Sequence, residues 1–425
     1  MLRSIFRIRM IMSWEGRGSC NGRAAIARLD FRILWRRDPL WLAGRAWRPV
    51  FCLKGSCEPL PTAFFMESNA CQTLPSPTDW LLRIPDVFAS HAEEILAGLG
   101  ASPRKMLGSD YRLVHLSDPM PLRDSEWAPF VRWNLPVHHA WPCCPQKMEG
   151  FVEKAAQAIF RKFSPYGPQS ILIGPLQSGG HPYYKHLAVN LRGRTLQLFP
   201  ALPAAQEVEA QDPESFSLFC LVGKEGLFCG LRRPREANGF YPGGTKFIRQ
   251  SSPDTVSRAG AKIVEALHYG KLHHPGLAEG ARWLELGASP GGMSSELLAR
   301  GYHVTAVDRA PMDPRLRNHP GLEFIRADVG DFHVQEGRRF DALLCDMNGD
   351  ALAAIRQVSR LAKALVPGGW IIFTLKGAGA ESPQELITLT RAAIADAKAA
   401  GLRLIARTHL TYNRHEFTLF FERSA

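Results

Sequence analysis

Hydrophobic and polar residues follow two different periods in the C-terminal part of the chain, residues 245–425. Short runs of four to eight apolar residues indicate buried strands, whereas apolar residues three and four apart indicate helices. Strands are predicted at Trp283–Leu286, His303–Val307, Leu322–Ile325, Asp341–Cys345, Trp370–Leu375, Leu402–His409 and Glu416–Phe421, and helices at Met293–Arg300, Ala351–Leu365 and Gln384–Ala400. This alternation is typical of an α/β fold with a doubly wound, mostly parallel sheet.

Residues 78–240 show a less regular pattern, which predicts an α+β domain. The expected helices are Pro85–Leu99 and Lys147–Phe163, and the expected strands are Asp79–Ile84, Ser170–Ile173, His186–Asn190, Thr195–Phe199, Ser215–Val222 and Leu227–Leu231. The segment from Pro234 to Gly244 is rich in Gly and Pro, and we place the domain boundary there.

Residues 1–65 differ from the rest of the chain in composition, because they hold many Arg residues, few acidic residues and four Trp. Such a segment can be a targeting presequence, a basic arm that binds RNA, or an extension without a folded role upstream of a start at Met66. We favour the third interpretation, an unstructured extension or mis-assigned start. Most of the net charge of +12 lies in this segment, so the charge of the whole chain is weak support for nucleic-acid binding.

Several classes of protein are disfavoured by composition. No run of about 18 apolar residues occurs, which argues against a membrane-spanning helix. The nine cysteines form no CxxC pair, and we expect neither a disulfide framework nor a zinc site. The adjacent pairs His138-His139 and Cys143-Cys144 are a weak metal-binding pattern, so we predict no metal. The cysteine content is explained most simply by a location in the reducing cytoplasm.

A glycine-rich motif runs from Glu285 to Gly292, between a predicted strand and a predicted helix. It lacks the third glycine of a dinucleotide-binding fingerprint and the Gly-Lys-Ser/Thr of a phosphate-binding loop. Its pattern, ExGxxPGG, is that of the first motif of S-adenosylmethionine-dependent methyltransferases. We therefore expect a cofactor-binding site made of Glu285, Gly287, Ala288, Ser289, Pro290, Gly291, Gly292, Met293, Asp308, Asp328 and Asp346.

The two aspartates of this set that follow the next strands have separate expected roles. Asp308 ends the second strand and is placed to accept hydrogen bonds from ribose hydroxyls, while Asp328 follows the third strand and is placed near an adenine. Either one alone is also compatible with an N-cap or a turn.

Four further ionisable residues lie at points that the fold should bring together. Asp346 and Lys376 end the fourth and fifth strands, Glu416 begins the last strand, and Lys262 lies on a predicted helix before the glycine motif. Arg258 is four residues before Lys262, so we expect the two to share a helix face.

These residues carry a family resemblance. The chain resembles the FtsJ/RrmJ-type RNA 2'-O-ribose methyltransferases, whose active site is a Lys-Asp-Lys-Glu tetrad, and most closely the RlmM-type branch with two domains. Shared segments are Phe240–Phe247, Ser257–Lys262, Gly287–Gly292, Cys345–Met347, Leu375-Lys376 and Tyr412–Glu416. Ser289 stands where the family usually has Cys or Ala. The resemblance implies S-adenosylmethionine as cofactor, 23S ribosomal RNA as substrate, and an N-terminal THUMP-related domain that binds RNA. It also implies an antiparallel strand near one edge of the sheet, formed here by Glu416–Phe421.

The resemblance also implies roles for the tetrad. Methyl transfer requires that the ribose hydroxyl lose its proton, and Lys376 is the expected base, oriented by Asp346. Lys262 and Glu416 are expected to position the hydroxyl. Partial burial and the second ammonium should lower the pKa of Lys376 toward neutrality.

Alternative functions remain open at this point. The acceptor could be a tRNA or another molecule, or the chain could be a non-catalytic RNA-binding or ribosome assembly factor. A nucleophilic role for Cys345 is disfavoured, because apolar strand residues flank it. We expect RNA as the partner, no membrane association and a monomer.

Overall fold

The computed structural model describes residues 76–143, 148–177, 182–199, 202, 208–248 and 255–424, together with three short strands nearer the start of the chain. The chain forms two compact units, Met1–Cys71 and Gln72–Ala425. In the first unit, β1 (Arg7–Ile11), β2 (Arg28–Leu34) and β3 (Val50–Cys52) form an antiparallel sheet. The rest of residues 1–65 lies outside the described residues, so their expected lack of a folded role stays a prediction.

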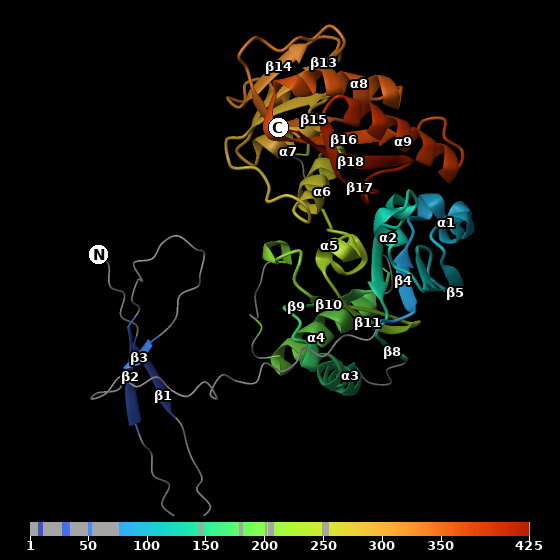
Figure 1. Cartoon of the computed structure of the whole chain (residues 1–425), viewed down its shortest axis with the longest axis vertical. Helices are drawn as coiled ribbons and strands as arrows, with labels where there is room; N and C mark the ends of the chain where they lie inside the picture. Colours follow the sequence, from blue (N-terminus) through green and yellow to red (C-terminus); the bar gives the residue numbers. More distant parts are fainter. Residues whose placement is uncertain are drawn as a thin grey trace, which may run out of the picture. The chain divides into compact units, whose positions relative to one another are not determined.

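Two four-stranded sheets form the N-terminal region of the second unit, residues 76–240 (Figure 1). The first has the order β5-β6-β4-β7 and is wholly antiparallel. Its elements are β4 (Asp79–Arg83), α1 (Ala92–Gly98), β5 (Ser102–Leu107), β6 (Tyr111–His115), α2 (Pro121–Asp124) and β7 (Trp133–Pro136). The strand and the helical segment predicted over residues 79–99 are confirmed, although the first turns are a 3-10 helix, Asp86–His91.

The second sheet has the order β8-β11-β10-β9. Its elements are β8 (His139–Trp141), α3 (Met148–Phe163), β9 (Ser170–Pro175), α4 (Pro182–Leu198), β10 (Ser217–Gly223), β11 (Gly226–Arg232) and α5 (Pro234–Ala237). The predicted helix α3 and the hairpin of β10 and β11 are confirmed. The mixture of sheet and helix agrees with an α+β region.

The strands predicted at His186–Asn190 and Thr195–Phe199 are wrong, because both segments lie almost entirely in α4. Buried residues recur every four positions along this helix, at Leu187, Leu191 and Thr195, and the first two pack into the core under the sheet. A four-residue period gives one helix face, whereas the short apolar runs considered alone resembled strands.

A seven-stranded sheet forms the centre of the C-terminal region, residues 255–424, with the order β14-β13-β12-β15-β16-β18-β17. The first five strands are parallel, and β18 is antiparallel to both β16 and β17, as predicted. The strands are β12 (Arg282–Leu286), β13 (His303–Asp308), β14 (Leu322–Arg326), β15 (Phe340–Cys345), β16 (Leu365–Lys376), β17 (Leu402–Thr408) and β18 (Glu416–Arg423).

Helices cover both faces of this sheet, which confirms the doubly wound arrangement (Figure 1). One face packs on α8 (Ala351–Leu361) and α9 (Pro383–Ala399), and the other on α6 (Gly260–Gly270) and α7 (Gly292–Leu298). Asp350 begins α8 and accepts a hydrogen bond from the backbone N–H of Ala353, which satisfies a free donor of the first turn. In the described part of the chain, helices fall short of the length and apolar character needed to cross a membrane.

Candidate active site

A cavity of the C-terminal region has a volume of about 610 Å3 and lies where β12, β13 and β15 end. Loops that follow parallel strands meet at one edge of a sheet, which is where α/β folds bind ligands. All of the expected cofactor residues line this cavity except Gly291: Glu285, Gly287, Ala288, Ser289, Pro290, Gly292, Met293, Asp308, Asp328 and Asp346. The sequence did not single out Ser257, Arg309, Asn348 or Gln357, which also line it.

Gly291 is required by the turn and does not itself line the cavity. Its φ of 106° belongs to the left-handed region, and a Cβ atom there would lie 2.3 Å from the sulfur of Met312. Gly287 also has a positive φ, 76°, directly after β12. Both positions therefore need glycine for the sharp turn from β12 into α7.

Asp308, at the end of β13, holds the glycine-rich loop in place. Its two carboxylate oxygens accept hydrogen bonds from the backbone N–H groups of Ser289, at 2.9 Å, and Ala310, at 2.8 Å. Each oxygen has a second lone pair, so the carboxylate can also accept hydrogen bonds from hydroxyl groups in the cavity. Its position agrees with the predicted contact to a ribose.

Asp328 lies two residues beyond the end of β14, in a turn. Its carboxylate accepts a hydrogen bond from the N–H of Gly330 at 2.7 Å and lies 3.5 Å from the guanidinium of Arg309. Both charged side chains are largely exposed, so this ion pair contributes little to stability. The predicted adenine contact of Asp328 stays a prediction.

Glu285 is buried at the base of the cavity and accepts a hydrogen bond from the Ser294 hydroxyl at 2.6 Å. Burial, assisted by the nearby Asp346 and Asp308, raises the pKa of Glu285 to about 8. The side chain is therefore largely protonated at neutral pH, because desolvation disfavours the carboxylate.

The four residues of the predicted tetrad form a closed ring of alternating charges, here called the tetrad ring. The ammonium of Lys376 lies 2.5 Å from Asp346 and 2.8 Å from Glu416. The ammonium of Lys262 contacts the other oxygen of Glu416 and lies 3.6 Å from Asp346. Each carboxylate thus has two lysine partners, and each lysine has two carboxylate partners.

The sheet register explains why two of these residues meet. Lys376 and Glu416 are direct partners across the antiparallel pair of β16 and β18, where opposite side chains lie on one face. Asp346 follows β15, the neighbour of β16 on the other side. Lys262 comes from the first turn of α6. Arg258 was expected to share its helix face, but α6 begins only at Gly260, so Arg258 lies in the preceding turn.

The expected lowering of the pKa of Lys376 is wrong for this arrangement. Burial by itself lowers the pKa of Lys376, but the carboxylates of Asp346 and Glu416 together outweigh it and raise the pKa above its ordinary value. Conversely, burial raises the pKa of Glu416, but the two lysines outweigh it and the pKa is lowered. The ring therefore favours the charged forms of Lys376 and Glu416.

A second cavity, of about 380 Å3, shares Lys376 with the first and is lined by residues 376–380 and 414–416. Lys376 lines both cavities, while Glu416 lines only the second. The tetrad ring thus separates a cavity that could hold a cofactor from one that could hold an acceptor.

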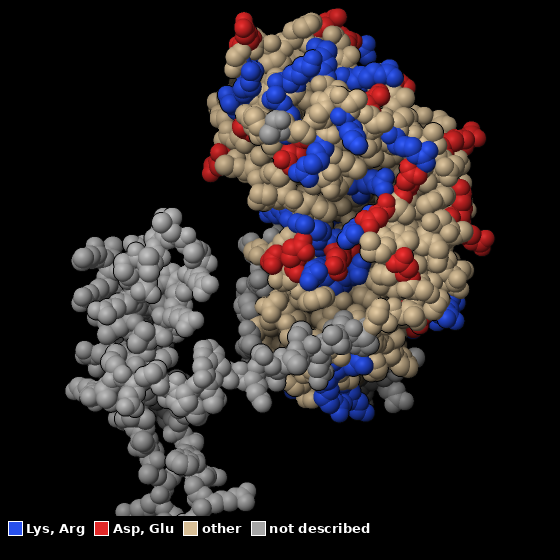
Figure 2. Space-filling model, in the orientation of Figure 1, with Lys and Arg blue, Asp and Glu red and all other residues tan. Residues whose placement is uncertain are grey.

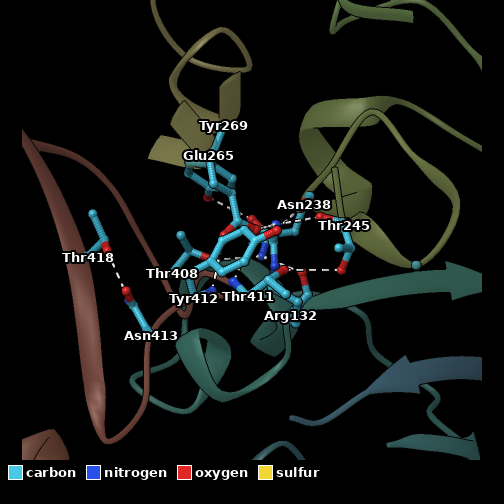
Figure 3. Close-up of polar contacts among 12 residues, drawn as sticks. Arg132, Asn238, Thr245, Glu265, Tyr269, Thr408, Thr411, Tyr412, Asn413 and Thr418 are labelled. Carbon is cyan, nitrogen blue, oxygen red and sulfur yellow. Dashed lines mark hydrogen bonds and ion pairs between the residues drawn. The ribbon is translucent and has the colours of Figure 1, made fainter. Parts of the chain in front are cut away.

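A buried polar cluster, here called the joint, connects the N-terminal region with α6 (Figure 3). Arg132, just before β7, forms an ion pair with Glu265 of α6 at 2.8 Å, and the side chains are 2% and 0% exposed. Glu265 also accepts hydrogen bonds from the backbone N–H groups of Thr411, at 3.0 Å, and Tyr412, at 3.3 Å. Nothing in the sequence pointed to this pair, because its members are 133 residues apart.

Asn238 extends the joint toward β17 (Figure 3). Its side-chain amide donates to the carbonyl of Arg132 at 3.0 Å and to the Thr408 hydroxyl at 3.2 Å, and it accepts from the Tyr269 hydroxyl at 2.6 Å. The segment around residue 240, where we expected a domain boundary, is therefore hydrogen-bonded to both regions.

Cys345 is fully buried at the end of β15. Burial raises the pKa of its thiol to about 12, so a thiolate nucleophile is disfavoured at this position. This agrees with the expectation that Cys345 belongs to the core.

Comparison with known proteins gives the family. A sequence model of the FtsJ-like methyltransferases matches residues 255–366. The ribosomal RNA large subunit methyltransferase M of Alkalilimnicola ehrlichii is 34% identical over 329 residues, which cover 70% of this chain and 82% of that protein. This chain belongs to the same family, ribosomal RNA large subunit methyltransferase M. Its C-terminal region accordingly has the Rossmann-like methyltransferase fold.

Other members match over shorter segments. The methyltransferase M of Halorhodospira halophila is 29% identical over 221 residues, 51% of this chain and 60% of that protein. The one from Marinobacter nauticus is 34% identical over 152 residues, 35% of this chain and 40% of that protein. The chain thus matches about half of the length of these relatives.

The cofactor of the family, S-adenosylmethionine, fits the first cavity. The cavity has the size of a small-molecule site, and its lining combines a tight glycine turn with carboxylates at two successive strand ends. The carboxylate of Asp308 and the backbone of residues 287–289 face the cavity as the groups that would hold the nucleoside. The residues that line this cavity are therefore compatible with the cofactor of the family.

Proposed function

We propose that the chain transfers a methyl group from S-adenosylmethionine to a ribose 2'-hydroxyl of RNA, with 23S ribosomal RNA as the substrate. The observation that carries the proposal is the closed tetrad ring between two cavities. The family of the chain supports an RNA acceptor, since its relatives are named ribosomal RNA large subunit methyltransferase M.

In this mechanism, the residues of the chain bind the cofactor and the RNA acceptor, and one of them accepts the proton of the ribose hydroxyl. S-adenosylmethionine supplies a methyl group on a positively charged sulfur. Asp308 and the loop after β12 hold the cofactor, and the acceptor ribose enters from the second cavity, beside Lys376 and Glu416. A ribose hydroxyl is a weak nucleophile until its proton is removed.

Lys376 is the group that we propose receives this proton at its Nζ atom, because it lies where the two cavities meet. The raised pKa of Lys376 means that the amine must first lose its own proton. A neighbouring cation favours the neutral amine, and Lys262, which shares both carboxylates with Lys376, is such a cation. Asp346 and Glu416 orient the amine.

The N-terminal region is proposed to bind RNA as a THUMP-related domain. Its support is the family and the joint, which fixes this region beside α6 and the loop before Glu416. The Lys and Arg side chains visible in Figure 2 are spread over the surface in separate groups, which favours several local RNA contacts over one large patch. Among the described cysteines, Cys220, Cys229 and Cys345 are free thiols, which is compatible with the proposed cytoplasmic location.

The test uses the full chain and RNA from cells that lack this protein. The RNA is incubated with the chain and methyl-labelled S-adenosylmethionine, digested to nucleosides and separated. Label in a 2'-O-methylnucleoside from 23S ribosomal RNA is the expected result. Label only in methylated bases would overturn the proposal, label in tRNA would change the substrate, and cofactor binding without any labelled RNA would favour a non-catalytic role.

A further inference from the structure

Phe247 is the most exposed large apolar side chain among the described residues, at 87%, although its backbone is held in place. On one side, the hydroxyl groups of Thr245 and Thr411 lie 3.2 Å apart. On the other side, the hydroxyl of Tyr412 lies 3.2 Å from both the N–H and the carbonyl of Ile248. A single exposed apolar residue needs no explanation by itself. Here, however, contacts on both sides of Phe247 fix the backbone, so that its aromatic ring stays exposed to solvent.

The loop that holds this segment leads directly into the second cavity. Arg414 follows Tyr412 by two residues, which span roughly 7 Å when extended, and it lines the cavity together with His415 and Glu416. The segment that contains Phe247 is therefore bonded, through Tyr412, to the loop that lines the cavity we assign to the acceptor.

Arg414 is the second unusual residue of this site. It is exposed, and no described residue forms an ion pair or a hydrogen bond with its guanidinium. Two other exposed arginines of the same region are paired, Arg403 with Glu422 and Arg391 with Glu126 at 2.6 Å. The guanidinium groups of Arg258 and Arg317 also have no such partner among the described residues, but neither residue lines a cavity of this site. An unpaired guanidinium at the mouth of a cavity is available to bind a phosphate through two hydrogen bonds.

We propose that Phe247 and Arg414 form a binding site for single-stranded RNA next to the methylated ribose. Phe247 stacks on an unpaired base, and Arg414 binds a backbone phosphate of the strand that enters the second cavity. Base stacking on an aromatic side chain requires a base that is free of its helix, so the site selects a loop or an opened strand. The inference rests on the proposed function and adds the form of the RNA and two residues that contact it.

The test measures equilibrium binding of RNA extracted from cells that lack this protein, by filter retention at several salt concentrations, and the methylation rate in parallel. Phe247→Ala should weaken RNA binding about tenfold or more, whereas Phe247→Tyr should retain it. Arg414→Ala should weaken binding and lower the dependence on salt by roughly one phosphate contact. All variants should bind S-adenosylmethionine as the wild type does.

Two control variants keep the proposed contacts intact. Phe247→Tyr retains an aromatic ring, and Arg403→Ala removes an exposed arginine of the C-terminal region that is paired with Glu422. The proposal is overturned if Phe247→Ala and Arg414→Ala bind RNA like the wild type, or if the controls weaken binding equally. A wild-type chain that binds RNA but transfers no methyl group contradicts the proposed function, while the binding comparison still decides this site. A wild-type chain that binds no RNA contradicts both.

Discussion

The tetrad ring and the joint are two clusters of ion pairs that share one helix, α6, yet they differ in burial. In the joint, Glu265 is 0% exposed, and its carboxylate is used by Arg132 and by two backbone N–H groups. In the ring, Lys262, one turn earlier, is 20% exposed, and two of the four members line the acceptor cavity. In the joint, neighbouring groups pair the charged side chains completely, so these side chains stabilise the fold. In the tetrad ring, two charged side chains line an open cavity, so they are available to a ligand.

The joint also holds two elements that carry ring residues. Glu265 lies three residues after Lys262 on α6, and it accepts hydrogen bonds from the loop that leads to Glu416. We therefore expect a substitution in the joint to move the residues of the ring, whereas a substitution in the ring should leave the joint intact.

The largest effect is expected for Lys376→Ala. Loss of a general base typically lowers a rate by 10²–10⁴-fold, so we expect methyl transfer to fall by about 10³-fold, while the affinity for S-adenosylmethionine, measured by calorimetry, changes little. Lys376→Arg keeps the charge but cannot act as a base near neutral pH. If the arginine variant keeps most of the activity, Lys376 acts through its charge and the role of base is wrong.

Glu265→Gln should have the largest effect on stability. Breaking a buried ion pair leaves the Arg132 charge without its partner, which costs about 3–5 kcal/mol in the free energy of unfolding. Urea denaturation measures this loss. Glu296→Gln is the control, because it removes an ion pair of 2.8 Å with Arg300 whose side chains are 39% and 35% exposed, and it should change stability by less than about 1 kcal/mol. Equal losses in the two variants would contradict the distinction between buried and open clusters.

The pH dependence of kcat/KM should show the raised pKa of Lys376. The base must be the neutral amine, and a raised pKa keeps this form rare until the pH is high. Because kcat/KM reports the free enzyme, it should rise by about tenfold per pH unit from pH 7 to pH 9. The rise should disappear in the residual activity of Lys376→Ala. A plateau already below pH 8 would show that this lysine does not limit the reaction as a base.

The smallest effect is expected from deletion of residues 1–65. All members of the ring and the joint belong to the compact unit of residues 72–425, and Met1–Cys71 forms a unit of its own. We therefore expect unchanged methyl transfer and an unchanged unfolding midpoint within about 0.5 kcal/mol. A loss of either property would show that the extension has a role, and would revive the interpretation as an RNA-binding arm.

Much of the C-terminal region follows from its sequence. Local signals such as the apolar run of Asp341–Cys345 and the glycine turn at 287–292 fix the elements, and the order of strand and helix then leaves few topologies. Residues at successive strand ends, such as Asp308 and Asp346, must meet at one edge of the sheet. The N-terminal region was harder, because α4 was interpreted as two strands and the exposed edge strand β5 has no alternating pattern.

The sequence by itself determined the elements of the methyltransferase fold, the turn that builds the cofactor cavity and the members of the tetrad. These features depend on local periodicity, glycine conformations and strand ends, which are set by residues close together in the chain. The tertiary structure alone decided the pKa of Lys376, the partner of Glu265 and the contact of Ile248 with Tyr412. Charge, burial and contact between residues far apart in the chain depend on distances that only the folded molecule sets.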